Sequence, residues 1–218
     1  VGDKVKKGSV LIKLRSNDMK SQLAQAQAQY DAQTAKLEEL RKGTRSEEIA
    51  VTQSQLSQAN AEFEDSKVYL LKMIQSSQVL ANSLVHFTID KYINNPNGSV
   101  PQLLIVTSNS QRATNVLYRR QQIEAAVDAW SSRVEYLSAG DSEKLLQASA
   151  DMHAYISDID SILGELIQLI SDDASGQFSG DKTSVSTART SATVADTDLT
   201  VAEQEVHDAA AGVSVIES

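Results

Sequence analysis

The feature that most constrains this chain is an unbroken heptad pattern of apolar and small residues over residues 47–92. The seam positions alternate at spacings of three and four: Ile49, Thr52, Leu56, Ala59, Phe63, Ser66, Leu70, Met73, Ser77, Leu80, Leu84 and Phe87. This spacing is typical of a helix with one apolar face. At 1.5 Å of rise per residue the helix is about 70 Å long, and a helix of that length needs a partner alongside it. The sequence therefore predicts a mainly α-helical chain.

Four further stretches repeat the same spacing, so we expect about five long antiparallel coiled-coil helices that form a hairpin or bundle. The seam of residues 16–42 is Leu23, Ala26, Tyr30, Gln33, Leu37 and Leu40. The seam of residues 111–139 is Val116, Ile123, Val127, Trp130, Val134 and Leu137. The next seam is Leu145, Ala148, Met152, Ile156, Ile159, Leu163, Leu166 and Ile170. The last seam has mostly small residues: Val185, Ala188, Ala192, Ala195, Leu199, Ala202, Val206, Ala209 and Val213.

Turn-forming residues separate these helices. Gly43 predicts a helix break at residues 43–46, and Asp141 or Ser142 is expected to cap the fourth helix. The strongest turn signal, and the candidate hairpin tip, is formed by Asn95, Pro96, Asn97 and Gly98. The predicted segments are residues 1–15, an N-terminal β segment; 16–92, a first coiled-coil arm; 93–110, a turn and extended segment; 111–171, two middle helices; 172–184, a polar loop; and 185–218, a returning helix that we expect to be truncated.

Composition and motifs exclude several classes of function. The net charge of −9 and the pI of about 4.8 argue against a nucleic-acid partner, because no basic surface is available to neutralise phosphates. The absence of cysteine excludes disulfides and thiolate metal sites. No nucleophile elbow, phosphate-binding loop or dinucleotide fingerprint is present, so we do not expect an enzyme. No apolar run reaches the roughly 18 residues that a membrane-spanning helix needs.

The residues that attract attention as ligands have simpler interpretations. His86, His153 and His207 fall on three different predicted helices without a second ligand at metal-binding spacing. The aspartates of the 172–184 loop lack the spacing of a calcium-binding loop, so we expect a solvated loop. Trp130 is in phase with its seam and is expected in the core. We predict neither a metal nor a small-molecule cofactor.

Two patterns near the N-terminus resemble those of a known family. The first consists of Gly2, Asp3, Val5, Gly8 and Leu11, which looks like half of a biotinyl-lipoyl (barrel-sandwich) domain. The second, a helix-break motif, consists of Gly43, Arg45, Glu47, Glu48 and Ile49. Their order, with an Ala- and Gln-rich helix between them and a long helix after them, is similar to that of HlyD-like membrane fusion proteins, the periplasmic adaptors of efflux and secretion systems. The close match covers about the first 70 residues.

The resemblance implies a structural adaptor in the cell envelope. It would lie in the periplasm, anchored to the inner membrane in the full-length protein, with an inner-membrane transporter as partner and with self-association into a ring. Residues 1–15 would form two short strands that lack partners within this chain, so we expect these strands to be frayed or to lean on the helices. Adaptors that dock on outer-membrane channels carry an Arg, a Leu four residues later and a Ser near the tip. Residues 92–120 lack this pattern, so we do not expect an outer-membrane channel partner.

Two alternatives accompany this interpretation. A biotin- or lipoate-carrying domain would present its modified lysine about ten residues after Gly8, where the chain has Asp18; Lys20 lies within the helical pattern. A helical bundle that senses a ligand or binds another protein would account for the larger core residues of the middle helices. An apolar cavity would favour such a bundle, and a dry packed seam would favour the adaptor.

Overall fold

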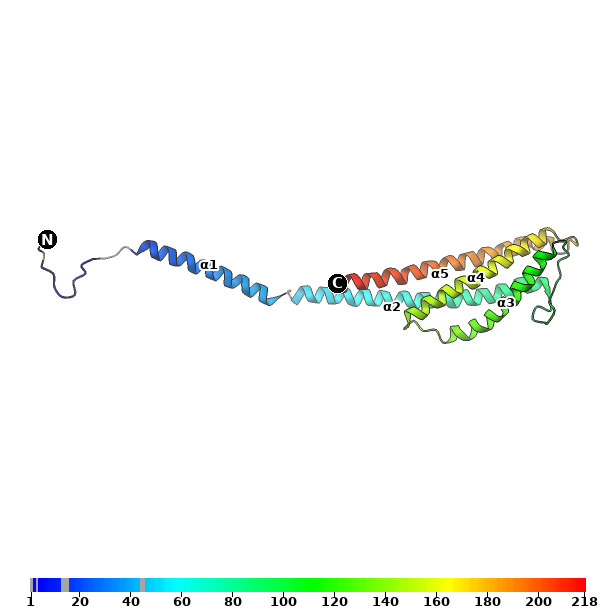
Figure 1. Cartoon of the computed structure of the whole chain (residues 1–218), viewed down its shortest axis with the longest axis horizontal. Helices are drawn as coiled ribbons and strands as arrows, with labels where there is room; N and C mark the ends of the chain where they lie inside the picture. Colours follow the sequence, from blue (N-terminus) through cyan, green and yellow to red (C-terminus); the bar gives the residue numbers. More distant parts are fainter. Residues whose placement is uncertain (1, 3, 13–15, 44–45) are drawn as a thin grey trace. The chain divides into compact units, whose positions relative to one another are not determined.

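The computed structural model describes residues 2, 4–12, 16–43 and 46–218, apart from the side chain of Asp128. Most of these residues are helical, which confirms the mainly α fold (Figure 1). The chain divides into two compact units, Val1–Gln53 and Ser54–Ser218, and each is described by itself.

The first unit contains helix α1, Asn17–Lys42, and the beginning of α2, Ser46–Ser83. Helix α1 ends where predicted, at Gly43, whose φ of 65° lies in the left-handed region that glycine tolerates best. No residue of α1 is buried, so its seam is a stripe of exposed apolar side chains.

The prediction of two strands in residues 1–15 is wrong for the part that the structure describes. Residues 2 and 4–12 contain a turn at Lys7 and Gly8 and no strand, and Val5 and Leu11 are exposed. The physical reason is that a strand needs a hydrogen-bonded neighbour, and none of the described residues supplies one. Asp3 lies outside the described residues.

The second unit contains the rest of α2 and the remaining elements. These are the π-helix η1, Leu84–Ile89; the 3₁₀-helix η2, Asp90–Tyr92; strands β1, Ile93–Asn94, and β2, Gln102–Leu103; helices α3, Ser110–Glu135, and α4, Ser142–Ser171; the 3₁₀-helix η3, Ser179–Asp181; and helix α5, Lys182–Glu217. Asp141 caps α4 as predicted, accepting a hydrogen bond from the Lys144 backbone N–H at 3.1 Å.

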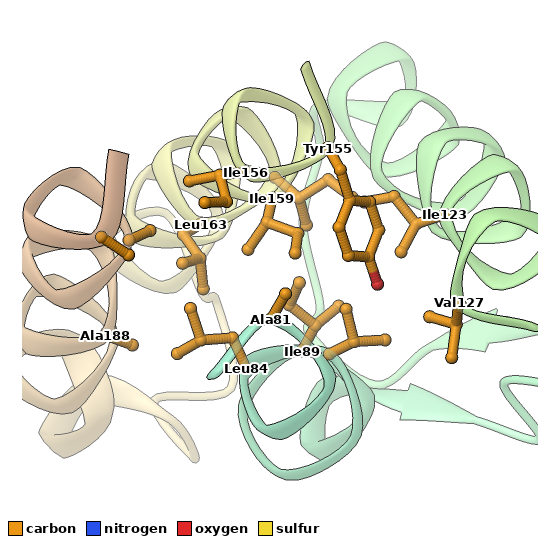
Figure 2. Packing of buried hydrophobic residues seen from close by; sticks show 14 of the residues in the cluster. Ala81, Leu84, Ile89, Ile123, Val127, Tyr155, Ile156, Ile159, Leu163 and Ala188 are labelled. Atoms are coloured by element: carbon orange, nitrogen blue, oxygen red, sulfur yellow. The ribbon is translucent and has the colours of Figure 1, made fainter. Parts of the chain in front are cut away.

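Helix α4 forms the centre of the core. All eight of its predicted seam residues are buried, and it packs against α5, α3 and the π-helix. Figure 2 shows Leu163 and Ile159 of α4 directed toward Leu84 and Ile89, with Ala188 of α5 on one side and Ile123 of α3 on the other. The small residues of the α5 seam allow α5 to approach α4 closely.

The π-helix corrects the predicted seam of the long helix. Phe87 was expected in the core, but 81% of its surface is exposed. The wider turn of a π-helix changes which side chains face inward, and within this one Leu84, Val85 and Ile89 are the buried residues. Phe87 is consequently directed away from the core.

Helix α5 returns alongside α2 in the opposite direction. One hollow is lined by residues 73–80 of α2 and 187–198 of α5, and a second by residues 62–69 of α2 and 205–209 of α5. The residue numbers of α5 rise as those of α2 fall, so the two helices are antiparallel. Helices α3 and α4 are inserted between them in the sequence and complete the bundle (Figure 1).

Shortening a single side chain in the α4 seam should destabilise the whole second unit. Leu163→Ala is expected to lower the free energy of unfolding by about 2–5 kcal/mol, because it leaves a cavity at a fully buried position. Val79→Ala, on the exposed side of α2, should change it by less than about 0.5 kcal/mol. Urea unfolding followed by circular dichroism measures both, and equal effects would contradict this core.

Candidate functional site

The predicted hairpin tip is a short β-hairpin at one end of the bundle. Strand β1 pairs antiparallel with β2, with Ile93 opposite Leu103. Asn95 has a φ of 53°, a conformation that asparagine tolerates, and its carbonyl accepts a hydrogen bond from the Gly98 N–H at 3.0 Å. The turn at residues 95–98 is therefore confirmed, while its role as a contact surface stays a prediction.

A buried arginine on α3 holds this hairpin to the bundle. Only 1% of Arg120 is exposed. Its Nε donates to Asp90 Oδ1 at 2.5 Å and its Nη2 donates to Asp90 Oδ2 at 2.7 Å. Its remaining donors reach Glu124 Oε2 at 2.5 Å and Asn97 Oδ1 at 3.2 Å. One side chain thus joins α3, the end of the long helix and the tip itself.

The charge on Arg120 is stabilised by its partners. Burial by itself would lower the pKa of Arg120, but the hydrogen bonds that Arg120 donates to Asp90 and Glu124 outweigh burial and raise that pKa above its ordinary value. The two Asp90 bonds form the bidentate geometry that guanidinium groups favour. Loss of either partner would leave a buried charge uncompensated.

Sequence reasoning missed Arg120, although the signal was present. Arg120 is in phase between Val116 and Ile123, at a position where the apolar seam demands an inward side chain. Glu124 follows four residues later, on the same face of the helix. A charged residue at a seam position with an opposite charge four residues on is a recognisable sign of a buried ion pair.

The loop after α4 forms the second half of this end of the bundle. Tyr92 packs edge-on against Phe178 with ring centroids 5.3 Å apart, and its hydroxyl donates to Asp181 Oδ2 at 3.2 Å. Burial first, and then the charge of Asp181, raise the pKa of Tyr92. Lys91 Nζ lies 2.7 Å from Asp181 Oδ2 and is the main reason that the Asp181 pKa lies below its usual range.

Asp173 organises the same loop by accepting backbone hydrogen bonds. It accepts from the N–H groups of Val106 at 3.3 Å, Ser175 at 3.1 Å and Phe178 at 3.1 Å. The Ser175 hydroxyl bond, at 2.7 Å, contributes most to lowering the Asp173 pKa. Most of the loop is exposed, as expected of a solvated loop, but Phe178 is buried and Asp173 joins the loop to the segment after β2.

The three histidines lie on three different elements, His86 on η1, His153 on α4 and His207 on α5. His153 Nδ1 contacts Asp196 Oδ1 at 2.6 Å, with Glu203 3.6 Å from its other ring nitrogen, and His86 Nδ1 lies 3.3 Å from Asp90. No group of three or more ligand side chains suited to a metal ion occurs among the described residues. Trp130 is buried as predicted, and the guanidinium of Arg133 lies 5.3 Å from its ring centroid.

Four residues of the second motif of the N-terminal resemblance lie at the end of α1 and at the start of α2. Gly43 ends α1, and Glu47 and Glu48 occupy the first turn of α2, where negative charge is favoured. Ile49 is 46% exposed. Arg45 lies outside the described residues, so its expected role at the helix break stays a prediction.

Comparisons with known protein families, with curated proteins and with solved structures give no match for this chain. None of the helices that the structure describes has an apolar run sufficient to cross a bilayer.

Replacement of Arg120 should cost far more than replacement of its neighbour. Arg120→Ala is expected to lower the free energy of unfolding by about 3–5 kcal/mol, because Asp90 and Glu124 lose the buried cation that pairs them. Arg119→Ala, whose half-exposed side chain lies 3.7 Å from Asp158, should cost less than about 1 kcal/mol. If urea unfolding finds the two variants equally stable, the Arg120 network is not a structural anchor.

A matched pair of tyrosine variants tests the hydrogen bonding of the core. The Tyr92 hydroxyl has a partner, so Tyr92→Phe should lower stability by about 1 kcal/mol. The buried Tyr155 hydroxyl has no hydrogen-bond partner among the described residues, so Tyr155→Phe should raise stability by about 1 kcal/mol. Thermal and urea unfolding show whether each variant is more or less stable than the natural protein. Two changes in the same direction would contradict this assignment of hydrogen bonds to the two hydroxyls.

Proposed function

We propose that this chain is the helical arm of an HlyD-like membrane fusion protein, a periplasmic adaptor that links an inner-membrane transporter to an export path. The observation that carries the proposal is the antiparallel pair of α2 and α5, joined through a rigid turn region at one end. An adaptor needs such an outgoing and returning pair, because the pair sets how far the protein reaches. The N-terminal motifs quoted above add the family resemblance.

The mechanism is geometric rather than chemical. Helix α2 has 38 residues, so it spans about 57 Å. A single helix of that length bends easily, whereas burial of Leu70, Ile74 and Ala81 in the bundle core stiffens α2 within the second unit. The Arg120 and Asp173 contacts fix the turn region against the bundle, so a partner at the tip would meet a preformed surface.

The N-terminal segment fits this function as half of a larger domain. In the family, the pattern carried by Gly2, Val5, Gly8 and Leu11 belongs to a barrel-sandwich fold that a second half completes. The described part of this segment is exposed and without strands, as expected of strand residues without their neighbours. The proposal therefore places the pairing partner of residues 1–15 elsewhere in the full protein.

The proposed partners follow from the same resemblance. They are an inner-membrane transporter and further copies of the adaptor arranged as a ring in the periplasm. An outer-membrane channel is not among them, because residues 92–120 lack the docking pattern of channel-binding adaptors. The tip at Asn95–Gly98 would contact another component of the export path.

A ligand-sensing bundle receives less support from the cavities. A hollow of about 600 Å³ between α2 and α5 is open to solvent, and Ser and Thr supply half of its lining residues. Small-molecule sites usually enclose most of the ligand surface.

Cross-linking in the native envelope tests the proposed function. The full-length protein, tagged and cross-linked in cells, should co-purify with an integral inner-membrane transporter and with its own copies. A Leu163→Asp variant, which disrupts the bundle core, should lose the transporter or the export of its substrate, whereas Val79→Asp on the exposed side of α2 should retain both. If the cross-linked protein is purified without any membrane transporter, the adaptor function is contradicted.

A further inference from the structure

The turn at residues 95–98 contains an asparagine that is followed by a glycine, Asn97–Gly98. Eight asparagines occur in the chain, and Asn97 alone among them precedes a glycine. In such a pair the backbone nitrogen of the second residue can attack the side-chain amide of the asparagine. Glycine hinders this attack least, because it has no side chain and its backbone rotates most freely. Asn97 is therefore a candidate for covalent modification.

The packing of the turn requires glycine at position 98. A Cβ atom added to Gly98 would lie 1.8 Å from Asn95 Nδ2 and 2.3 Å from Asn95 Cγ. These distances are far below van der Waals contact, so a side chain at position 98 would displace the side chain of Asn95. The turn thus depends on the same glycine that makes Asn97 reactive.

The amide of Asn97 is open to attack at the surface. Asn97 is exposed, and its Oδ1 accepts a hydrogen bond from Arg120 Nη2 at 3.2 Å. A cationic donor on this oxygen draws electrons from Cγ, the atom that the backbone nitrogen attacks. The leaving atom, Nδ2, donates no hydrogen bond to any residue that the structure describes. The fold therefore holds the side-chain oxygen and leaves the departing nitrogen free.

One hydrogen bond opposes the reaction. The Gly98 N–H donates to the Asn95 carbonyl at 3.0 Å, so the attacking nitrogen must leave this bond first. Residues 94–99 are exposed or half-buried, and opening such a segment locally costs much less than unfolding the bundle. The hydrogen bond thus slows the attack without preventing it.

The other asparagines are less suited to the reaction. Asn95 precedes Pro96, whose nitrogen carries no proton that could be lost. Asn94 precedes Asn95, whose side chain hinders the approach of its nitrogen. Asn109 caps α3, and its side chain is held by a hydrogen bond from the Arg112 N–H at 3.1 Å. The remaining four lie within helices, where the backbone conformation is unsuited to closing a five-membered ring: Asn17, Asn60, Asn82 and Asn115.

We propose that Asn97 is a site of spontaneous deamidation. The Gly98 nitrogen forms a bond to Asn97 Cγ, the bond from Cγ to Nδ2 breaks, and Nδ2 leaves as ammonia with the proton that Gly98 lost. Water then opens the five-membered succinimide ring at either of its two carbonyl carbons, which gives aspartate or isoaspartate at position 97. The reaction needs water alone, so no enzyme, oxidant or reductant takes part. This inference goes beyond the adaptor function and does not rest on it.

Deamidation places a new negative charge beside Arg120. The guanidinium of Arg120 already pairs with the carboxylates of Asp90 and Glu124. One guanidinium cannot balance a third carboxylate at position 97, which the other two repel at short range. Isoaspartate also adds one carbon to the main chain of the turn. Both products should therefore loosen the attachment of the tip to α3.

Peptide mass spectrometry of the aged protein tests the proposal. At physiological temperature and mildly alkaline pH, Asn97 should convert to aspartate and isoaspartate at least about ten times faster than Asn94, which is also exposed but precedes a residue with a side chain. The rate should rise with pH, because the Gly98 nitrogen attacks after losing its proton. Equal rates at Asn94 and Asn97, or no conversion of Asn97, would overturn the proposal.

Asn97→Gln provides the matched control, because the larger ring that glutamine would form closes much more slowly. In anion-exchange chromatography the aged natural protein should develop a more acidic species, and the aged Asn97→Gln variant should not. The same acidic species in both proteins would assign the modification to another residue and overturn the proposal.

Hydrogen exchange tests the consequence for the tip. The Leu104 N–H donates to the Tyr92 carbonyl at 2.8 Å, beside the paired strands. In NMR spectra of the Asn97→Asp variant this N–H should exchange at least about three times faster than in the natural protein. Asn94→Asp adds the same charge at a residue without a hydrogen bond to Arg120 among the described contacts, and it should leave the exchange nearly unchanged. Equal exchange in the two variants would overturn the proposed loosening of the tip.

Discussion

The burial of the apolar face of α4 is the interaction on which the rest of the second unit depends. That face supplies the residues against which the long helix, α3 and α5 all pack, and most of its seam is completely removed from water. Each fully buried leucine or isoleucine contributes about 1.5–3 kcal/mol of transfer free energy, which α2 and α5 could not obtain from each other. Between those two helices lies an open groove instead of a packed seam. Helix α4 therefore holds them in an antiparallel arrangement without closing the space between them.

The long helices were predictable because heptad spacing reflects a simple geometric requirement. The seams of α4 and α5 are buried almost as predicted, and Asp141 caps the helix that it precedes. The position of Phe87 was not predictable, since a π-turn changes the inward face without any glycine or proline to mark it. Nor could the pattern alone distinguish a seam that is covered from one that is exposed: the seam of α1 has the same spacing as the α4 seam, but none of its residues is buried.

The candidate site was less predictable than the fold, for a related physical reason. The turn at Asn95–Gly98 follows from local residue preferences, but its attachment to the bundle depends on Arg120, which lies more than twenty residues away in the sequence. The loop of Asp173 and Phe178 likewise acquires its order from Tyr92 and Val106. Long-range polar contacts of this kind leave only weak local signals, such as a charged residue at a seam position. The resemblance to adaptors rests on the N-terminal motifs. These motifs belong to the first unit, so this support for the proposed function is independent of the bundle in the second unit.

The proposed arm depends on the antiparallel course of α2 and α5, and distances between paired spin labels test this course most directly. Labels at Asp65 and Asp208, introduced through cysteines, should give a short and narrow distance distribution in pulsed electron paramagnetic resonance. Labels at Asp65 and Thr187 should be much farther apart, because 21 residues of α5 add about 31 Å along the helix. A shorter distance for the second pair, or equally broad distributions for both, would contradict the returning arm and the adaptor function built on it.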